Sequence, residues 1–184
     1  MNAESFDPVE AHPHISKQLQ QMVDVEQNMR ERSQEENTWD ETVDIQNTEQ
    51  MKQLIATIGW PSISKVGAEG SENAWLLVQH ADLDVEFQSL CLNLMKDVPL
   101  YDIDPTNIAY LEDRVCVNTG AEQVYGTQFR QVDGRHVPLP IRDIDQVDAR
   151  RAAMGMDPLQ AQIDSMYEAY PFDTNDSWVS KTKN

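Results

Sequence analysis

The apolar positions of this chain recur mostly at helical spacing. Near the N-terminus they follow one another at steps of three and four residues: Ile15, Leu19, Met22, Val25 and Met29. This spacing puts the five side chains on one side of a helix, predicted over residues 14–33. The stripe covers barely two heptads, which favours packing on the domain's own core over a coiled-coil seam.

Further helices are predicted where apolar stripes coincide with capping residues. A polar, acidic connector over residues 33–47 leads to a second helix that starts near Asn47-Thr48 and stops at Gly59. Two glycines in residues 62–70 indicate a loop. The predicted helices after this connector cover residues 48–58, 71–79, 83–96, 104–118, 145–154 and 157–167.

Two interpretations remain open around His80. If Asp82 caps the helix over residues 83–96, His80 lies at a corner between two helices. If one helix runs through this segment instead, His80, Asp84 and Gln88 share one face.

The periodicity changes to two after residue 122. Residues 123–129 alternate like a strand, and Asp133-Gly134 is a strong hairpin signal. Pro138 and Pro140 make the return strand an edge strand. We therefore predict a mainly α protein, a single compact helical domain with one β-hairpin at about residues 122–141. The domain should span residues 14–170, between a flexible tail over 1–13 and a C-terminal tail over 171–184.

Charge and composition narrow the classes of partner. The 184 residues carry a net charge of −18, from 14 basic against 32 acidic side chains. Such a surface repels nucleic acid and anionic membranes. A basic protein or a small polar molecule stays open as partner.

The acidic N-terminus and the lack of an 18-residue apolar run make the cytoplasm the default compartment. Cys91 and Cys116 lie in apolar surroundings and should be free, buried thiols.

Polar residues gather at the ends and flanks of the apolar segments, where a core alone would not require them. The segments are Gly59-Trp60-Pro61, Gln79-His80-Ala81-Asp82, Phe87-Gln88, Ala109-Tyr110-Leu111-x-Asp113-Arg114, Gln123-x-Tyr125-Gly126-Thr127-Gln128 and Arg150-Arg151. This ordered set resembles a bacterial family of domains of unknown function over about residues 48–167, with the N-terminal helix and both tails outside it. The resemblance implies a shared helical domain and brings no known activity or catalytic residue.

His80 is the leading candidate for proton transfer, because imidazole titrates near neutral pH and a carboxylate such as Asp82 or Asp84 could orient it. We predict His80, Asp82 and Asp113 as catalytic residues. A histidine that is merely bonded to a helix end remains the alternative.

Arg114 could clamp a carboxylate or phosphate, or only pair with Asp113 or with a carboxylate on the neighbouring helix. Arg150-Arg151 is explained by surface pairs with Asp145 and Asp148. Glutamine and tyrosine suit a polar neutral ligand. The predicted ligand-binding residues are Trp60, Gln88, Tyr110, Arg114, Gln123, Tyr125 and Gln128.

No cofactor is predicted. The four histidines are scattered, and neither a His-Glu-x-x-His nor a Cys-x-x-Cys arrangement occurs. His80, Asp82 and another carboxylate could hold a divalent ion, although no metal-ligand spacing supports it. Nucleophile and phosphate-loop motifs are also absent from the sequence.

Two functions of different class remain. The first is an enzyme in which His80 is the general acid or base and Arg114, Gln123, Tyr125 and Gln128 hold a small polar substrate. The second is a non-catalytic, acidic, immunity-like protein that masks a basic partner. Under the first, we expect His80, Arg114 and Tyr125 to line one shared region.

Overall fold

The computed structural model describes residues 11–36 and 40–170, so most of the predicted tails over 1–13 and 171–184 lies outside the described residues. Its elements follow one another as α1 (Pro13–Glu36), α2 (Thr42–Ile58), α3 (Ile63–Gln79), α4 (Val85–Lys96), α5 (Pro105–Asn118), β1 (Phe129–Val132), β2 (Arg135–Pro138), the short 3-10 helix η1 (Ile144–Gln146), α6 (Val147–Ala153) and α7 (Leu159–Ala169). The predicted class, a mainly helical domain with one hairpin, is confirmed.

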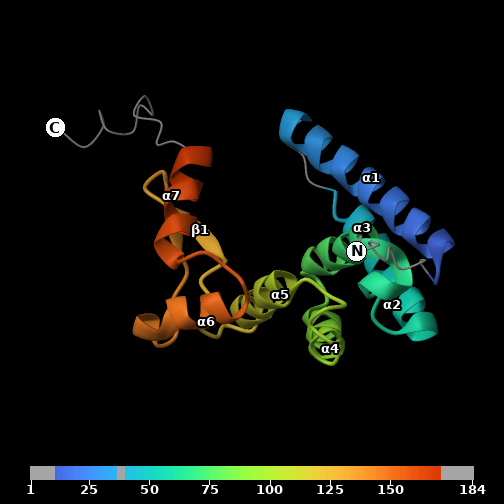
Figure 1. Cartoon of the computed structure of the whole chain (residues 1–184). Helices are drawn as coiled ribbons and strands as arrows, with labels where there is room; N and C mark the ends of the chain where they lie inside the picture. Colours follow the sequence, from blue (N-terminus) through green and yellow to red (C-terminus); the bar gives the residue numbers. More distant parts are fainter. Residues whose placement is uncertain (1–10, 37–39, 171–184) are drawn as a thin grey trace, which may run out of the picture.

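The long helix α1 packs along α3, and α2 contacts both of them (Figure 1). The core between these helices and α4 and α5 is formed by buried apolar side chains, among them Leu19, Met51, Val66, Leu77 and Met95. In Figure 1, α5 lies between this helical group and the C-terminal part, which contains the hairpin, α6 and α7. Residues on α5 can therefore contact both parts of the molecule.

The α1–α2 connection differs from the prediction. α1 continues to Glu36 and α2 already begins at Thr42, so the predicted connector over residues 33–47 is helical in most of its described part. Asn47 and Thr48 do not cap α2; they are buried within it, and the Thr48 hydroxyl donates to the Asp44 carbonyl at 2.8 Å. Acidic residues suit the first turn of a helix, so the polar composition of this segment was no evidence against helix.

The predicted loop over residues 62–70 is also wrong, because α3 begins at Ile63 and carries a kink at Gly67. Gly67 has φ 76° and ψ 169°, a conformation that breaks the helix for one residue only. A Cβ at Gly70 would come within 3.0 Å of the Ser16 hydroxyl. Both glycines therefore serve the shape and packing of α3.

The corner interpretation of His80 is confirmed, and the uninterrupted helix is wrong. α3 ends at Gln79 with His80 as its C-terminal cap, and α4 starts at Val85. The cap of α4 is Asp84, whose carboxylate accepts from the Phe87 amide at 3.0 Å, and not Asp82 as predicted. Asp82 is thereby left for contacts with α5.

The hairpin turn at Asp133-Gly134 is confirmed. β1 and β2 pair antiparallel, and both turn residues have positive φ, 49° at Asp133 and 75° at Gly134, as a type I′ turn requires. The strand predicted over residues 123–129 is wrong, because β1 begins only at Phe129 and residues 124–128 form a loop. β2 ends at Pro138, short of the predicted Ile141.

Replacing Gly134 by valine should lower the free energy of unfolding by about 1–2 kcal/mol, the cost of a left-handed conformation for a residue with a Cβ. We expect this loss because Gly134 has a φ of 75°, in the left-handed region. Urea denaturation of the two proteins measures the difference. A valine variant as stable as wild type would contradict the turn.

Both cysteines are free thiols, as predicted, but only Cys91 is fully buried while Cys116 is half-buried. Burial raises the pKa of the Cys91 thiol to about 12 and also raises that of Cys116. In the described part of the chain, no helix has the length and apolar character needed to cross a membrane.

Candidate functional site

Asp113 holds the loop that replaces the predicted strand. The residue is fully buried, and its carboxylate accepts from the backbone amides of Val124, Tyr125 and Thr127 at 2.6, 3.0 and 2.8 Å. These amides lack partners in a sheet, so the carboxylate supplies the hydrogen bonds that a strand would have made. This placement indicates a structural role for Asp113 and leaves it no exposed surface for catalysis.

Two arginines satisfy the carbonyls of the same loop. Arg150 Nε donates to the Val124 carbonyl at 2.7 Å, and Arg151 Nη1 donates to the Tyr125 carbonyl at 2.8 Å. The predicted surface pairing of Arg150-Arg151 is therefore wrong, and Arg151 is in fact 1% exposed.

The two ends of this loop are joined by the side chain of Gln123, the residue directly before it. The Gln123 amide donates to the Gln128 carbonyl at 3.0 Å and accepts from the Gln128 amide at 2.6 Å. Gln123 is fully buried and Gln128 is 9% exposed. Two predicted ligand-binding residues are thus part of the internal support of this loop.

A second network joins α4 to α5. The Gln88 side chain is buried and donates to the carbonyls of Val78 and Gln79, at 3.2 and 3.3 Å, at the end of α3. Asn118 donates to Gln88 Oε1 at 3.0 Å and to Asp82 at 2.9 Å. Gln88 therefore fixes the corner that carries His80 and Asp82.

Arg114 connects this corner to the loop. Its Nε and Nη2 both donate to the carboxylate of Asp82, and its Nη1 donates to Gln128 Oε1 at 3.0 Å. The bidentate pair is the geometry in which arginine binds carboxylates most strongly. Burial raises the pKa of Asp82, but the bonds from Arg114 and Asn118 outweigh it, so this pKa is lowered overall.

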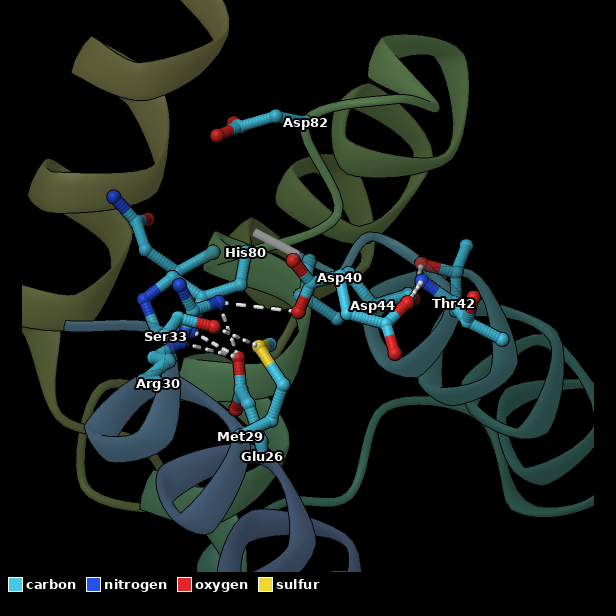
Figure 2. Close-up of polar contacts among 12 residues, drawn as sticks. Glu26, Met29, Arg30, Ser33, Asp40, Thr42, Asp44, His80 and Asp82 are labelled. Carbon is cyan, nitrogen blue, oxygen red and sulfur yellow. Dashed lines mark hydrogen bonds and ion pairs between the residues drawn. The ribbon is translucent and has the colours of Figure 1, made fainter. Parts of the chain in front are cut away.

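His80 is bonded to a carboxylate that the sequence interpretation missed. Its Nδ1 lies 2.5 Å from Oε1 of Glu26 on α1, whose side chain is only 1% exposed, while the His80 side chain is 24% exposed. Figure 2 shows Glu26, Arg30, Asp44 and His80 converging from α1, α2 and the end of α3, with Asp82 apart from them. Asp82 or Asp84 was predicted to orient the ring, but neither bonds to it. Glu26 orients the ring instead.

Arg30 links two carboxylates of this group. Its Nη2 donates to Glu26 Oε1 at 2.6 Å and to Asp44 Oδ1 at 3.1 Å. Burial raises the pKa of Glu26, but the bonds from His80 and Arg30 prevail, and the pKa of this carboxyl is lowered. Burial raises the pKa of Asp44, which Arg30 partly offsets and Glu26 reinforces, so this pKa is raised.

Several of the side chains described above line a pocket of about 290 Å³, which we call the His80 pocket. Its lining residues are Arg30, Glu41, Asp44, His80, Asp82, Leu83 and Arg114. His80 and Arg114 both line this pocket, whereas the third residue predicted to share a region with them, the half-buried Tyr125, does not. Trp60 is 2% exposed in the core, and Tyr110 lines another pocket near α7. Within residues 11–36 and 40–170, no three His, Cys, Asp or Glu side chains are grouped to hold a metal ion.

In the sequence, Glu26 stands out only as a charged residue at a position where the helical spacing of α1 expects an apolar one. It continues the inward spacing of Leu19 and Met22 and is fully buried, whereas Val25, chosen for its apolar side chain, is 56% exposed. Arg30 and Asp44 gave no signal, because each lies in a stretch rich in polar residues.

The model of a family of unknown function (DUF6624) matches residues 13–175. The chain belongs to this family. The DUF6624 match begins at α1, so it includes Glu26 and is wider than the resemblance over residues 48–167. The family domain therefore contains α1, the corner at His80 and the loop over residues 124–128. No curated protein and no solved structure matches the chain.

The low pKa of Glu26 gives a pH dependence that can be measured. Because its folded pKa lies below the ordinary value of 4.5, the carboxylate stabilises the fold above that pH, and the contribution is lost as the pH falls through the folded pKa. We expect Glu26→Gln to be less stable than wild type at neutral pH, by about 1–3 kcal/mol. The difference should shrink as the pH drops below 4.5. Urea denaturation at several pH values checks this, and a constant difference would contradict it.

Proposed function

We propose that this protein is an enzyme that transfers a proton to or from a small polar substrate in the His80 pocket. The observation that carries the proposal is the 2.5 Å contact between His80 Nδ1 and the buried carboxylate of Glu26, in a ring that lines the pocket. A carboxylate that orients an imidazole is a recurring arrangement in general acid–base catalysis.

The state of the ring follows from its partner. An ionised carboxylate can only accept hydrogen bonds, so Nδ1 of His80 carries the proton in this contact. The neutral ring then has its lone pair on Nε2. Among the described residues, Nε2 makes no hydrogen bond, which leaves it available to take a proton from a substrate.

Asp44 lines the pocket beside His80 and accepts from Arg30 at 3.1 Å. Glu26 and Asp44 share Arg30, yet the pKa of the first is lowered and that of the second is raised. Pairs of titratable groups with pKa values pushed apart are typical of acid–base sites. We assign His80 as the base and Asp44 as the acid, with Glu26 as a positioning residue.

Arg114 and Asp82 form another side of the pocket. Arg114 directs three N–H groups to Asp82 and Gln128, which fixes its guanidinium plane. A fixed guanidinium beside carboxylates suits a substrate with both hydrogen-bond donors and acceptors. Of the residues predicted for substrate binding, Arg114 keeps this role; Gln123 and Gln128 support it from within.

The alternative is a non-catalytic acidic protein that masks a basic partner. The net charge of −18 and the closed network around Asp113 favour it. It requires no titrating group in a pocket, so replacing His80 should not matter for its binding.

A mixture of polar metabolites provides the test. Purified wild type and His80→Asn are each incubated with the mixture, and the compounds are followed by mass spectrometry. We expect wild type to convert at least one compound that His80→Asn leaves unchanged. If wild type converts nothing, or if both proteins convert the same compounds equally, the enzyme proposal is wrong.

A further inference from the structure

A second pocket lies between α5, the α6–α7 connection and α7, away from His80. It has a volume of about 300 Å³, and we call it the Arg151 pocket. Its polar lining side chains are those of Thr106, Tyr110, Arg151, Asp157, Gln162 and Ser165. None of these residues lines the His80 pocket.

Arg151 is a buried cation whose pKa is lowered by burial, an effect that the carboxylates of Asp148, Asp113 and Asp157 partly offset from beyond ion-pair distance. The residue is 1% exposed, and no described carboxylate forms an ion pair with it. Its three hydrogen bonds go to neutral oxygens: the carbonyls of Asp157 at 2.6 Å and Tyr125 at 2.8 Å, and the side-chain amide of Gln162 at 3.3 Å. A buried charge usually has a counter-charge. The nearby carboxylates make no direct contact with this guanidinium among the described residues, so an anion from solution can bind it directly.

The guanidinium of Arg151 has more N–H donors than its three hydrogen bonds use. A guanidinium has five N–H groups, and the three bonds use one each on Nε, Nη1 and Nη2. One N–H on each of the two terminal nitrogens is therefore unused among the described contacts. Two terminal N–H groups can bind the two oxygens of a carboxylate.

Gln162 accepts two long hydrogen bonds from donors that line the pocket. Its Oε1 accepts from both Arg151 Nη2 and the Tyr110 hydroxyl, each at 3.3 Å, which is longer than a usual hydrogen bond. A carboxylate oxygen would make shorter, charge-assisted bonds to the same two donors. It could displace the amide, since Gln162 is only half-buried.

From this arrangement we propose that the Arg151 pocket binds a small carboxylate-bearing molecule through Arg151 and the Tyr110 hydroxyl. The Ser165 hydroxyl is a further donor for a polar substituent, whereas the Thr106 hydroxyl already donates to Asp104 at 2.8 Å. The exposed Asp157 also lines the pocket, and its negative charge favours a singly charged carboxylate over a doubly charged phosphate. This proposal is independent of the function assigned to His80.

Binding of lactate, followed in ¹H–¹⁵N spectra at the Arg151 side chain, tests the proposal. We expect saturable shifts in wild type, with inorganic phosphate binding more weakly. Tyr110→Phe removes one hydroxyl and should weaken lactate binding on the order of tenfold. His80→Asn should leave it unchanged, so failure here is distinct from failure of the proposed enzyme.

Because Arg151→Lys removes the side-chain signal itself, this variant is followed at the backbone amides around the pocket, where the lactate-dependent shifts should be lost. Tyr110→Phe decides the question if the lysine variant does not fold. The proposal is overturned by the absence of saturable shifts in wild type, by equal lactate binding in Tyr110→Phe, or by tighter binding of phosphate than of lactate.

Discussion

Replacing Asp113 by alanine is expected to lower the free energy of unfolding by about 3–5 kcal/mol, because it leaves several buried backbone donors without acceptors. The carboxylate accepts from the amides of Val124, Tyr125 and Thr127, and the residue itself is fully buried. Water cannot replace these bonds unless the loop opens. Urea denaturation followed by circular dichroism measures the loss.

The neighbouring Glu112→Ala is the matched control. Among the residues that the structure describes, Glu112 forms an ion pair only with Lys96, at 2.9 Å, and the lysine side chain is 41% exposed. Such pairs contribute less than about 1 kcal/mol. If Asp113→Ala were no less stable than Glu112→Ala, the loop would have to be held by other contacts, and Asp113 would regain its place among the catalytic candidates.

His80→Asn should lower turnover of any substrate of the His80 pocket by a factor on the order of 10² to 10⁴, with little change in stability. The amide nitrogen of asparagine lies about where Nδ1 of histidine lies, so it can still donate to Glu26, which Nδ1 now contacts at 2.5 Å. The variant thus keeps the bond to Glu26 and removes Nε2. Turnover and melting temperature are measured together.

The exposed His14→Asn makes the same chemical change outside the pocket and should leave both quantities unchanged. His80→Ala, in contrast, should lose about 1–3 kcal/mol, because Glu26 then loses a partner. A His80→Asn variant with full turnover would remove His80 from catalysis. A variant that loses turnover only in step with its stability would assign His80 a structural role.

The features that the sequence determined by itself are local. The predicted start of the helix over residues 104–118 is confirmed by a bond from the Thr106 amide to Asp104 at 2.8 Å, and the Asp133-Gly134 turn by its two positive φ angles. The break at His80 was likewise one of the two predicted interpretations. Caps, turns and helical stripes depend on neighbours a few residues away, so composition and spacing were enough to predict them.

Tertiary structure decided the rest, because burial depends on which elements meet. Residues 124–128 alternate like a strand, yet they form a loop since Asp113 from α5 and Arg150 and Arg151 from α6 satisfy its backbone. Hydrophobicity favoured Val25 for the core where the structure buries Glu26. Arg30 lies one turn away on the same helix, but the other partner of this carboxylate, His80, reaches it only because α1 packs on α3. A charge becomes stable inside a protein through partners distant in sequence, and those partners are set by the fold.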